Sequence, residues 1–363
     1  MENKKNKKKV VVGMSGGVDS AVAAYLLEQQ GYEVIGVTIK IWDSDREYEY
    51  VREDSCCGLS AVSDARGVAA SMGIPYYVYS FSDIFEDKII KNFVEEYRKG
   101  HTPNPCVLCN REIKWRALLE RAKVLGADYV ATGHYASIEK LPNGRYCVKM
   151  DGDIKKDQTY ALNQLTQEEL SHTLFPLGGL DKPAVREIAA KAKLLVANKP
   201  DSQEICFVND NDYAGFIKNY DKIEDEPGNF VLEDGEILGR HRGIIHYTIG
   251  QRKGLGLSLK APLYVKRIDP ERNEVVLSSN EELFASKMLV RDINYMAIED
   301  FEDGLECIVK VRYAHKGTPA KIYHEGDGIR VEFEENVRAI TPGQAAVFYD
   351  NERRVLIGGI IVK

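Results

Sequence analysis

Hydrophobic positions in the first half of the chain alternate between short apolar runs and helical spacing. The apolar runs predict strands over residues 10–12, 33–42, 74–81 and 128–132. Helical spacing predicts helices over residues 23–27, 59–72, 84–98 and 112–125, and Gly31, Gly73 and Gly126 close three of them. Repeated strand–helix units predict an α/β fold with a doubly wound parallel sheet, which binds ligands at the carboxyl ends of its strands.

Two further local elements are predicted before residue 209. Asn143-Gly144 indicates a hairpin over residues 136–150. Asp181-Lys182-Pro183 opens a helix that runs to about Lys193.

The hydrophobic pattern changes after about residue 209. Pro227-Gly228 and Asp234-Gly235 mark turns. Short alternating runs from about residue 283 onward predict strands over residues 308–313, 320–323, 329–333, 345–349 and 354–362. No long helix interrupts these runs, so they predict a small antiparallel β-barrel.

The length of 363 residues exceeds what one ordinary core organises. We predict an α/β nucleotide-binding domain over residues 1–209, a central domain over 210–283 and a C-terminal β-barrel over 284–363.

The composition is that of a soluble globular protein, without an apolar run of membrane-spanning length. Residues 1–9 are basic, but no signal-peptide core follows them, so we expect a cytoplasmic protein. The seven cysteines are therefore expected to be reduced thiols with chemical, metal-binding or core roles, and not a disulfide framework.

The net charge of −7 does not by itself indicate a nucleic-acid partner. Residues 239–268, however, contain seven lysines and arginines and no aspartate or glutamate. A local basic surface suits a polyanion, whereas acids from elsewhere in the fold would make it an ordinary solvated face. Charge alone leaves both interpretations open.

The segment Ser15-Gly16-Gly17-Val18-Asp19-Ser20 is the most informative motif. It joins a predicted strand to a predicted helix, an arrangement in which backbone N–H groups and the helix N-terminus face an anion. Asp19 brings negative charge to such a site, which a bridging cation would explain. The Gly-Lys-Ser/Thr ending of a Walker loop is missing. A plain tight turn is the alternative interpretation.

This loop resembles that of the PP-loop ATP pyrophosphatases. Those enzymes split ATP into AMP and pyrophosphate to adenylate a carbonyl oxygen. The resemblance implies ATP as a ligand, with Mg²⁺, but it does not identify the second substrate.

Cys106 and Cys109 lie in Thr102-Pro103-Asn104-Pro105-Cys106-Val107-Leu108-Cys109-Asn110, between two predicted helices. The prolines indicate a stiff exposed turn, and a thiol near the next helix N-terminus gains thiolate character. Half of a zinc site and two ordinary loop cysteines are the alternatives. Cys56-Cys57 is expected in a loop.

Cys206 follows a predicted helix end, in Pro200-Asp201-Ser202-Gln203-Glu204-Ile205-Cys206-Phe207. A single cysteine of this kind is by default a buried structural residue. If the loops of Cys109 and Cys206 meet over a nucleotide site, however, the two thiols allow thiol–disulfide chemistry.

Two shorter blocks complete the set of candidates. Gly133 and His134 end a strand at the expected ligand edge, where Gly133 would admit a nucleotide and His134 would face a substrate. A core histidine is the alternative there. The polar cluster at residues 156–160 is either functional or a surface turn.

Seven blocks occur in the order seen in the bacterial tRNA-specific 2-thiouridylases, the MnmA/TrmU family, and we therefore find that the chain resembles that family from about residue 10 to residue 363. The blocks are GMSGGVDSAVAA, TPNPCVLCNREIKW, ATGHYA, KDQTYAL, DSQEICFV, YTIGQRKGLG and TPGQAAVFY. Seven blocks in register are far more specific than the loop alone.

The resemblance implies roles for particular residues. Cys109 matches the catalytic nucleophile, and Cys206 matches the cysteine that carries a persulfide. The implied ATP-binding residues are Gly13, Met14, Ser15, Gly16, Gly17, Val18, Asp19, Ser20, Ile39 and Gly133. The implied tRNA contacts are Asn104, Pro105, Cys106, His134, Lys156, Asp157, Gln158, Arg312, Tyr313 and Gln344.

Cys106 departs from the family pattern, because many members carry aspartate at this position. Cys106, Cys109 and Cys206 together provide three thiols, enough for three corners of a [4Fe–4S] cluster with one open iron. We rank the persulfide route first and keep the cluster as its alternative.

The implied reaction is ATP-dependent 2-thiolation of the wobble uridine, U34, in tRNAs for Lys, Glu and Gln. ATP adenylates the C2 oxygen, a persulfide supplies sulfur, and AMP and pyrophosphate leave. A sulfur-donor protein, such as a cysteine desulfurase or a sulfur-relay protein, is then a partner. The rival hypotheses are an ammonia-dependent amide synthetase and a non-enzymatic RNA-binding or iron–sulfur carrier module.

Overall fold

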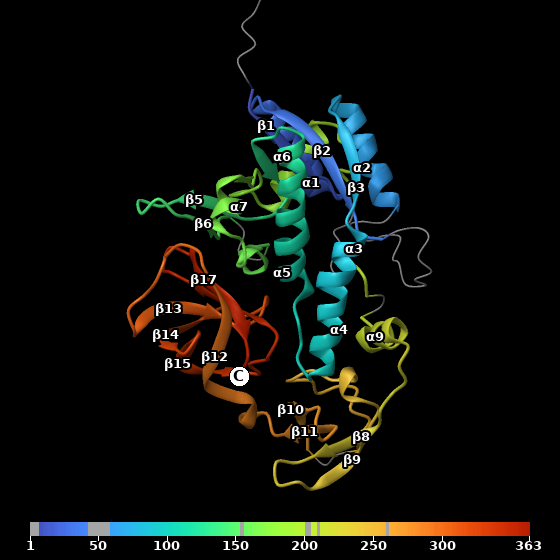
Figure 1. Ribbon diagram of the computed structural model, residues 1–363, viewed down its shortest axis with the longest axis vertical. Coiled ribbons are helices and arrows are strands. Elements are labelled where there is room, and N and C mark those ends of the chain that lie inside the picture. Colours follow the sequence, from blue (N-terminus) through green and yellow to red (C-terminus); the bar gives the residue numbers. More distant parts are fainter. Residues whose placement is uncertain (1–6, 43–58, 153–155, 200–204, 209–210, 259–260) are drawn as a thin grey trace, which may run out of the picture. The chain divides into compact units, whose positions relative to one another are not determined.

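The computed structural model describes residues 7–42, 59–152, 156–199, 205–208, 211–258 and 261–363 (Figure 1). The chain divides into two compact units. The first unit comprises residues 1–88, 106–209 and 352–355, and the second comprises residues 89–105, 210–351 and 356–363. The predicted loop around Cys56-Cys57 lies outside the described residues.

The first unit is built on a five-stranded sheet in the order β3-β2-β1-β4-β7. All of its pairings are parallel, which confirms the prediction for this part of the chain. The strands are β1 (Lys9–Gly13), β2 (Glu33–Lys40), β3 (Tyr76–Ser80), β4 (Tyr129–Ala131) and the two-residue β7 (Thr173–Leu174), which was not predicted. Because the strands run in parallel, the carboxyl ends of β1, β2 and β4 lie at the same edge of the sheet.

Helices cover both faces of this sheet. Val10 and Val12 share a buried cluster with side chains of α1 (Val18–Gln29), α2 (Leu59–Met72) and α8 (Lys182–Lys191). On the opposite face, α6 (Leu118–Val124) contacts β1 and β4. In this doubly wound arrangement the strand order reverses between β1 and β4, which is where such folds bind their ligands.

A long helical segment carries the block TPNPCVLCNREIKW from Pro105 onward, which we call the first cysteine block. It consists of α5 (Pro105–Cys109), the π-helical η2 (Asn110–Ala117) and α6, so the helix begins at Pro105 and not at residue 112. Proline is favoured in the first turn of a helix, and π-helical turns disturb the 3.6-residue spacing that the prediction used. The expected loop position of Cys106 and Cys109 is therefore wrong.

A second interrupted helix precedes that block. It runs from α3 (Ser82–Phe85) through the π-helical η1 (Glu86–Ile90) to α4 (Lys91–Arg98). The predicted hairpin is present as β5 (Ser137–Lys140) and β6 (Tyr146–Lys149), and Gly144 has a φ of +86° in its turn. A 3₁₀ turn, η3 (Thr159–Leu162), and α7 (Gln167–Ser171) follow.

The second unit contains a four-stranded sheet in the order β10-β11-β8-β9. Its core is formed by residues such as Phe230, Val265 and Leu277. The strands are β8 (Gly228–Val231), β9 (Ile237–His241), β10 (Tyr264–Asp269) and β11 (Glu274–Ser278), and α9 (Tyr213–Asp221) and η4 (Ile244–His246) accompany them. Sequence patterning predicted only the turns of this region.

The same unit ends in a closed antiparallel barrel in the order β12-β15-β14-β13-β16-β17, as predicted. The strands are β12 (Phe284–Tyr295), which η5 (Glu281–Leu283) precedes, β13 (Leu305–Lys310), β14 (Thr318–Glu325), β15 (Gly328–Arg338), β16 (Ala345–Tyr349) and β17 (Val355–Ile361). The β12 strand escaped prediction because its exposed and buried positions do not alternate regularly.

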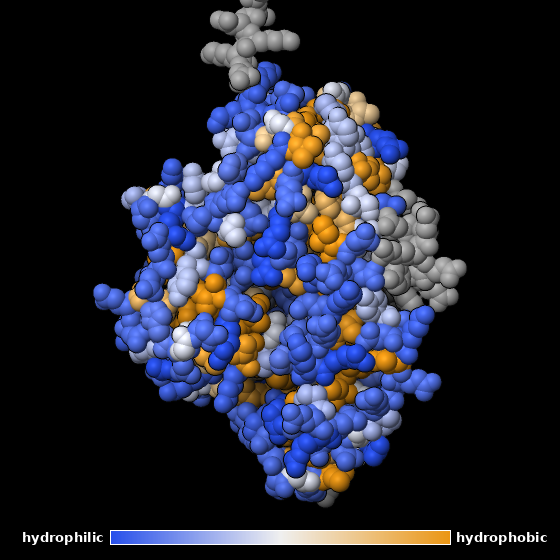
Figure 2. All heavy atoms as spheres, in the orientation of Figure 1, coloured by the Kyte–Doolittle hydropathy of each residue, from blue (hydrophilic) through white to orange (hydrophobic). Residues whose placement is uncertain are grey.

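Figure 2 shows a predominantly hydrophilic face with small, separate apolar groups. Among the described residues, no helix has the length and apolar character needed to cross a membrane.

Candidate active site

The Gly13–Ser20 loop, which we call the SGGVDS loop, connects the end of β1 to the start of α1. Ser20 is buried, and its Oγ accepts a hydrogen bond from the Ser15 N–H at 3.2 Å and donates to the Gly17 carbonyl at 3.1 Å. These bonds fix the loop from within. The α1 helix then begins at Val18, so its N-terminal N–H groups face the position expected for an anion.

Two glycines are needed because backbone approaches them closely. Gly16 has a φ of +67°, and a Cβ there would lie 2.3 Å from the Ala61 carbonyl oxygen of α2. A Cβ on Gly133 would lie 2.7 Å from the Ser20 nitrogen. Gly133 thus lets the end of β4 pack against the start of α1, whereas the sequence suggested close approach to a nucleotide.

The neighbouring strand end closes the loop on its other side. Met14 is buried, its N–H donates to the Val37 carbonyl at 2.8 Å, and its carbonyl accepts from Thr38 Oγ1 at 2.7 Å. Ile39, which the family resemblance implies as an ATP-binding residue, follows one residue later in β2 and pairs with Tyr79 of β3. Met14, Ile39 and Gly133 therefore share the carboxyl edge of the sheet.

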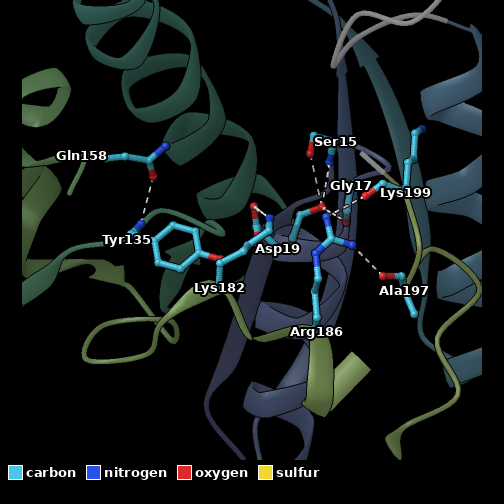
Figure 3. Close-up of polar contacts among 10 residues, drawn as sticks. Ser15, Gly17, Asp19, Tyr135, Gln158, Lys182, Arg186, Ala197 and Lys199 are labelled. Atoms are coloured by element: carbon cyan, nitrogen blue, oxygen red, sulfur yellow. Dashed lines mark hydrogen bonds and ion pairs between the residues drawn. The ribbon is translucent and has the colours of Figure 1, made fainter. Parts of the chain in front are cut away.

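Asp19 is held by two side chains from elsewhere in the first unit (Figure 3). The Tyr135 hydroxyl donates to Asp19 Oδ1 at 2.7 Å. The Lys182 ammonium lies 2.8 Å from Oδ1 and 2.9 Å from Oδ2. Lys182 therefore offsets the charge of Asp19, and no local sequence pattern predicted this pair.

The Lys156–Tyr160 cluster is built into the fold and is not a surface turn. Asp157 is buried and accepts from the Thr159 N–H at 3.1 Å and the Thr159 hydroxyl at 3.0 Å. Gln158 Oε1 accepts from the Tyr135 N–H at 2.9 Å, and the Gln158 N–H donates to the Tyr135 carbonyl at 3.1 Å. Gln158 therefore positions the tyrosine that holds Asp19. Lys156 is half-buried.

The five described cysteines are thiols in different environments. Cys106 is exposed, Cys109 and Cys206 are half-buried, and Cys147 and Cys307 are buried. Phe207, next to Cys206, is fully buried and packs edge-on against Phe85 at 5.7 Å between ring centroids. The backbone beside Cys206 is thereby anchored in the first unit.

A metal cluster does not fit the observed arrangement of these thiols. Among the described residues, no three histidine, cysteine, aspartate or glutamate side chains lie close enough together to hold a metal ion. Cys106, Cys109 and Cys206 therefore do not form the three corners that the alternative hypothesis requires.

His134 is tied to the first cysteine block. Its ring lies 5.5 Å from the buried Trp115 ring and 6.1 Å from the Phe175 ring, and its Nδ1 is 2.6 Å from Thr132 Oγ1. Burial, together with the Lys114 charge, lowers the pKa of His134 well below 6.5. His134 is thus a neutral imidazole at pH 7.

Asn110 lies inside the helical segment, directly after Cys109. Its side chain is buried and donates to the Ala161 carbonyl of η3 at 2.8 Å. The residue after Cys109 is thereby joined to the segment that follows the Lys156–Tyr160 cluster.

The segment at residues 197–199, earlier in the chain than Cys206, is held by α8. Arg186 donates to the carbonyls of Ala197 at 3.0 Å and Lys199 at 3.1 Å (Figure 3). Lys199 in turn contacts Asp64 of α2 at 2.5 Å. Arg186 lies one helical turn after Lys182, so α8 bonds to both the SGGVDS loop and this segment.

Five predicted tRNA contacts belong to the second unit. Asn104 and Pro105 end the segment after α4, and Gln344 Nε2 donates to the Thr102 carbonyl of that segment at 2.7 Å. Arg312 donates to the Arg338 carbonyl at 3.0 Å, and Tyr313 is 47% exposed. Tyr313 is thus exposed to solvent, whereas Gln344 and Arg312 form hydrogen bonds within the unit.

The basic stretch at residues 239–268 is partly neutralised. Lys266 lies 3.1 Å from Glu282 and 3.4 Å from Glu233, and Arg267 lies 2.9 Å from Asp269. Its other described lysines and arginines include the exposed Arg242, Arg252 and Lys253.

Three family models match consecutive parts of the chain. They are the tRNA methyl transferase HUP domain over residues 8–210, the tRNA methyl transferase PRC-barrel domain over 214–279 and the aminomethyltransferase beta-barrel domain over 285–361.

Curated relatives match along almost the whole chain. The tRNA-specific 2-thiouridylase MnmA of Lachnoclostridium phytofermentans is 57% identical over 357 residues, which are 98% of this chain and 100% of the relative. The chain belongs to the tRNA-specific 2-thiouridylase family. The MnmA proteins of Clostridioides difficile and Acetivibrio thermocellus are 52% and 53% identical, over 98% and 99% of this chain and 98% and 100% of their own lengths. The 2-thiouridylase relatives therefore correspond to both units.

Proposed function

We propose that the chain uses ATP to replace the C2 oxygen of the wobble uridine of tRNA with sulfur. Membership of the 2-thiouridylase family makes it a tRNA sulfurtransferase. The observation that carries the proposal is the SGGVDS loop at the N-terminus of α1, in the same compact unit as Cys109 and Cys206. An anion site in the same unit as two thiols suits a reaction that activates oxygen with ATP and then delivers sulfur.

In this proposal, the ATP phosphates accept hydrogen bonds from the N–H groups at the start of α1. The adenine lies toward Ile39 and Gly133. The Asp19 carboxylate is already bonded to Lys182 and Tyr135. Mg²⁺ would therefore be coordinated by the phosphate oxygens of ATP, which are ligands that it prefers. When bound, Mg²⁺ offsets phosphate charge. Gly13, Met14, Ser15, Gly16, Gly17, Val18 and Ser20 form the cradle.

The target uridine 34 must leave the anticodon stack, because its C2 oxygen is not reachable inside it. The C2 oxygen attacks the α-phosphate of ATP, so pyrophosphate leaves and the base becomes adenylated. Neutral His134 orients the base as a hydrogen-bonding group and carries no positive charge there. Asn104, Pro105, Cys106, Lys156, Asp157, Gln158, Arg312, Tyr313 and Gln344 are the further proposed tRNA contacts.

Sulfur then replaces the activated oxygen. A donor protein loads Cys206 as a persulfide, and its terminal sulfur attacks C2, so the oxygen leaves with AMP. The Cys109 thiolate attacks the Cys206 Sγ, which breaks the S–S bond, leaves sulfur on C2 and closes a Cys109–Cys206 disulfide. In a second form, Cys109 first releases hydrosulfide, which attacks C2. Both forms yield 2-thiouridine, AMP, pyrophosphate and one disulfide, which a reductant reopens.

The proposal also covers setting and organisation. We place the reaction in the cytoplasm on tRNAs for Lys, Glu and Gln. We assign ATP chemistry to residues 1–209 and tRNA binding chiefly to residues 210–283, with the barrel at 284–363 contributing Arg312, Tyr313 and Gln344.

The test is mass spectrometry of nucleosides from unmodified tRNA incubated with the protein, ATP, a persulfide donor and a reductant. We expect 2-thiouridine at position 34 and one AMP per thiolated base, with neither product in the Ser20→Ala variant. Formation of an amide product with ammonia, or tRNA binding without any ATP cleavage, would instead support one of the two rival hypotheses.

A further inference from the structure

The SGGVDS loop contains an electrostatic conflict that its own residues do not resolve. The N-terminal N–H groups of α1 favour an anion, yet Asp19 in the first turn of that helix adds a carboxylate beside them. A carboxylate next to a triphosphate raises the free energy of binding, because the two negative charges repel each other. ATP binding therefore requires a positive charge close to Asp19.

Lys182 meets this requirement by its position and burial. Its ammonium bridges both Asp19 oxygens, at 2.8 and 2.9 Å, and only 11% of its side chain is exposed. It is the first residue of α8, whose N-cap Asp181 accepts a hydrogen bond from the Ala184 N–H at 2.8 Å. The capped helix thus fixes the lysine backbone beside α1, with which α8 packs.

Tyr135 further fixes the position of the Asp19–Lys182 ion pair. Its hydroxyl donates to the same Oδ1 atom at 2.7 Å, and Lys182 lies 6.0 Å from the centre of its ring. Gln158 fixes the Tyr135 backbone from the other side. Asp19 is therefore held by a lysine and a tyrosine that come from two different segments (Figure 3).

We propose that Lys182 is a positioning residue of the nucleotide site: it neutralises Asp19 and so allows the SGGVDS loop to accept the phosphates of ATP. The inference rests on the proposed ATP-binding function. It adds a residue outside the seven sequence blocks to the site, and it assigns that residue a charge-balancing role that acts through Asp19.

The experiment compares the dissociation constants of ATP, in EDTA and without tRNA, for the wild type and three variants. Lys182→Met leaves the carboxylate uncompensated and should weaken ATP binding by about tenfold or more. The double variant Asp19→Asn/Lys182→Met has the same net charge as the wild type at this position and should bind within about threefold of it. Lys182→Arg, which keeps the charge, should also retain most of the affinity.

Lys191→Met is the matched control, because Lys191 ends the same helix with 74% of its side chain exposed and pairs with Glu187. It should bind ATP like the wild type. Thermal unfolding of each variant checks that the first unit is folded. Rescue of Lys182→Met by Asp19→Asn supports a role through Asp19, which a merely structural lysine would not show.

Three results would overturn the inference. Wild-type affinity in folded Lys182→Met would remove Lys182 from the nucleotide site. Equal weakening of the single and double variants would mean that Lys182 does not act through Asp19. Failure of the wild-type chain to bind ATP both in EDTA and with Mg²⁺ would refute both this inference and the proposed function, whereas the first two results leave the proposed function intact.

Discussion

Cys109 and Cys206 carry the proposed sulfur chemistry from very different backbone settings. Cys109 ends the short helix α5, and Cys206 lies in a turn next to the buried Phe207. Cys109→Ser and Cys206→Ser should each abolish 2-thiouridine formation, because one thiol holds the persulfide and the other releases its sulfur. Both variants should keep the wild-type dissociation constants for ATP and tRNA, since neither side chain is needed for binding.

Single-turnover assays would separate the two thiols further. Cys109→Ser loaded with persulfide should still release pyrophosphate from ATP and tRNA. Thiolation by either serine variant at more than a few per cent of the wild-type rate would remove that cysteine from the mechanism. Cys147→Ser is the control, because Cys147 is buried in β6 and has no proposed role.

Cys106 distinguishes the persulfide route from the iron–sulfur route. It is exposed and lies three residues before Cys109 on the same helix. Cys106→Asp should retain substantial activity, roughly within tenfold of the wild type, because the persulfide route needs no third thiol. Iron and sulfide analysis after anaerobic purification is the accompanying measurement. About four irons per chain, lost together with activity in Cys106→Asp, would favour the cluster instead.

The turn at Thr341-Pro342-Gly343-Gln344 supports the segment that leads to the cysteine helix. The Thr102 N–H donates to the Pro342 carbonyl at 2.9 Å, and Gln344 donates to the Thr102 carbonyl at 2.7 Å. Gln344→Glu removes the donor and places an acceptor against an acceptor. We expect the single-turnover thiolation rate at saturating tRNA to fall about tenfold, which corresponds to roughly 1.4 kcal/mol.

Hydrogen exchange distinguishes this role from a direct tRNA contact, because loss of a tRNA contact alone would not change the exchange rate of the Thr102 amide. The Thr102 amide should exchange faster in Gln344→Glu, while the dissociation constant for ATP should stay unchanged. If only tRNA affinity falls and Thr102 exchange is unaltered, Gln344 acts as a tRNA contact alone.

Glu96 near the end of α4 makes the second unit sensitive to acid. Its hydrogen bond with His101, at 2.7 Å, is the main reason that its pKa falls from 4.5 to about 2. A carboxyl with a lowered pKa stabilises the fold above its unfolded pKa, and this contribution disappears as pH falls toward the folded value. Here it amounts to roughly 2–3 kcal/mol at pH 7 and is lost between about pH 5 and pH 2.

The difference in the free energy of urea unfolding between Glu96→Gln and the wild type measures this contribution of Glu96 to stability. The variant should be less stable at pH 7, and the gap should close progressively as pH falls from 5 to 2. An equal gap at pH 7 and pH 2.5 would show that the loss comes from packing and not from ionisation.

The elements that sequence predicted well are those whose signals are local. The α2 helix has the predicted bounds, and the SGGVDS loop follows β1 as expected, because spacing and glycines specify such features within a few residues. The helix start at Pro105 was missed because π-helical turns break the regular spacing. Lys182 was missed because its bond to Asp19 spans 163 positions, and no local pattern encodes a contact of that kind.

Charge over the whole chain gives an incomplete account of how this protein would bind tRNA. The net charge is −7, yet within residues 239–268 Arg252 and Lys253 are exposed. Lys266 and Arg267 in the same stretch form ion pairs with Glu282 and Asp269. Cations already paired within the protein gain less from a phosphate, so only part of the stretch should contribute to RNA affinity.

Two double variants that remove the same charge test this division. Arg252→Gln/Lys253→Gln should weaken tRNA binding and lower the slope of log affinity against log salt by about one to two, because each lost phosphate contact contributes about 0.7–0.9. Lys266→Gln/Arg267→Gln is the matched control and should change the slope less. Filter binding at several salt concentrations provides both values. Equal slopes for the two variants would mean that net charge, and not the exposed basic pair, determines tRNA binding.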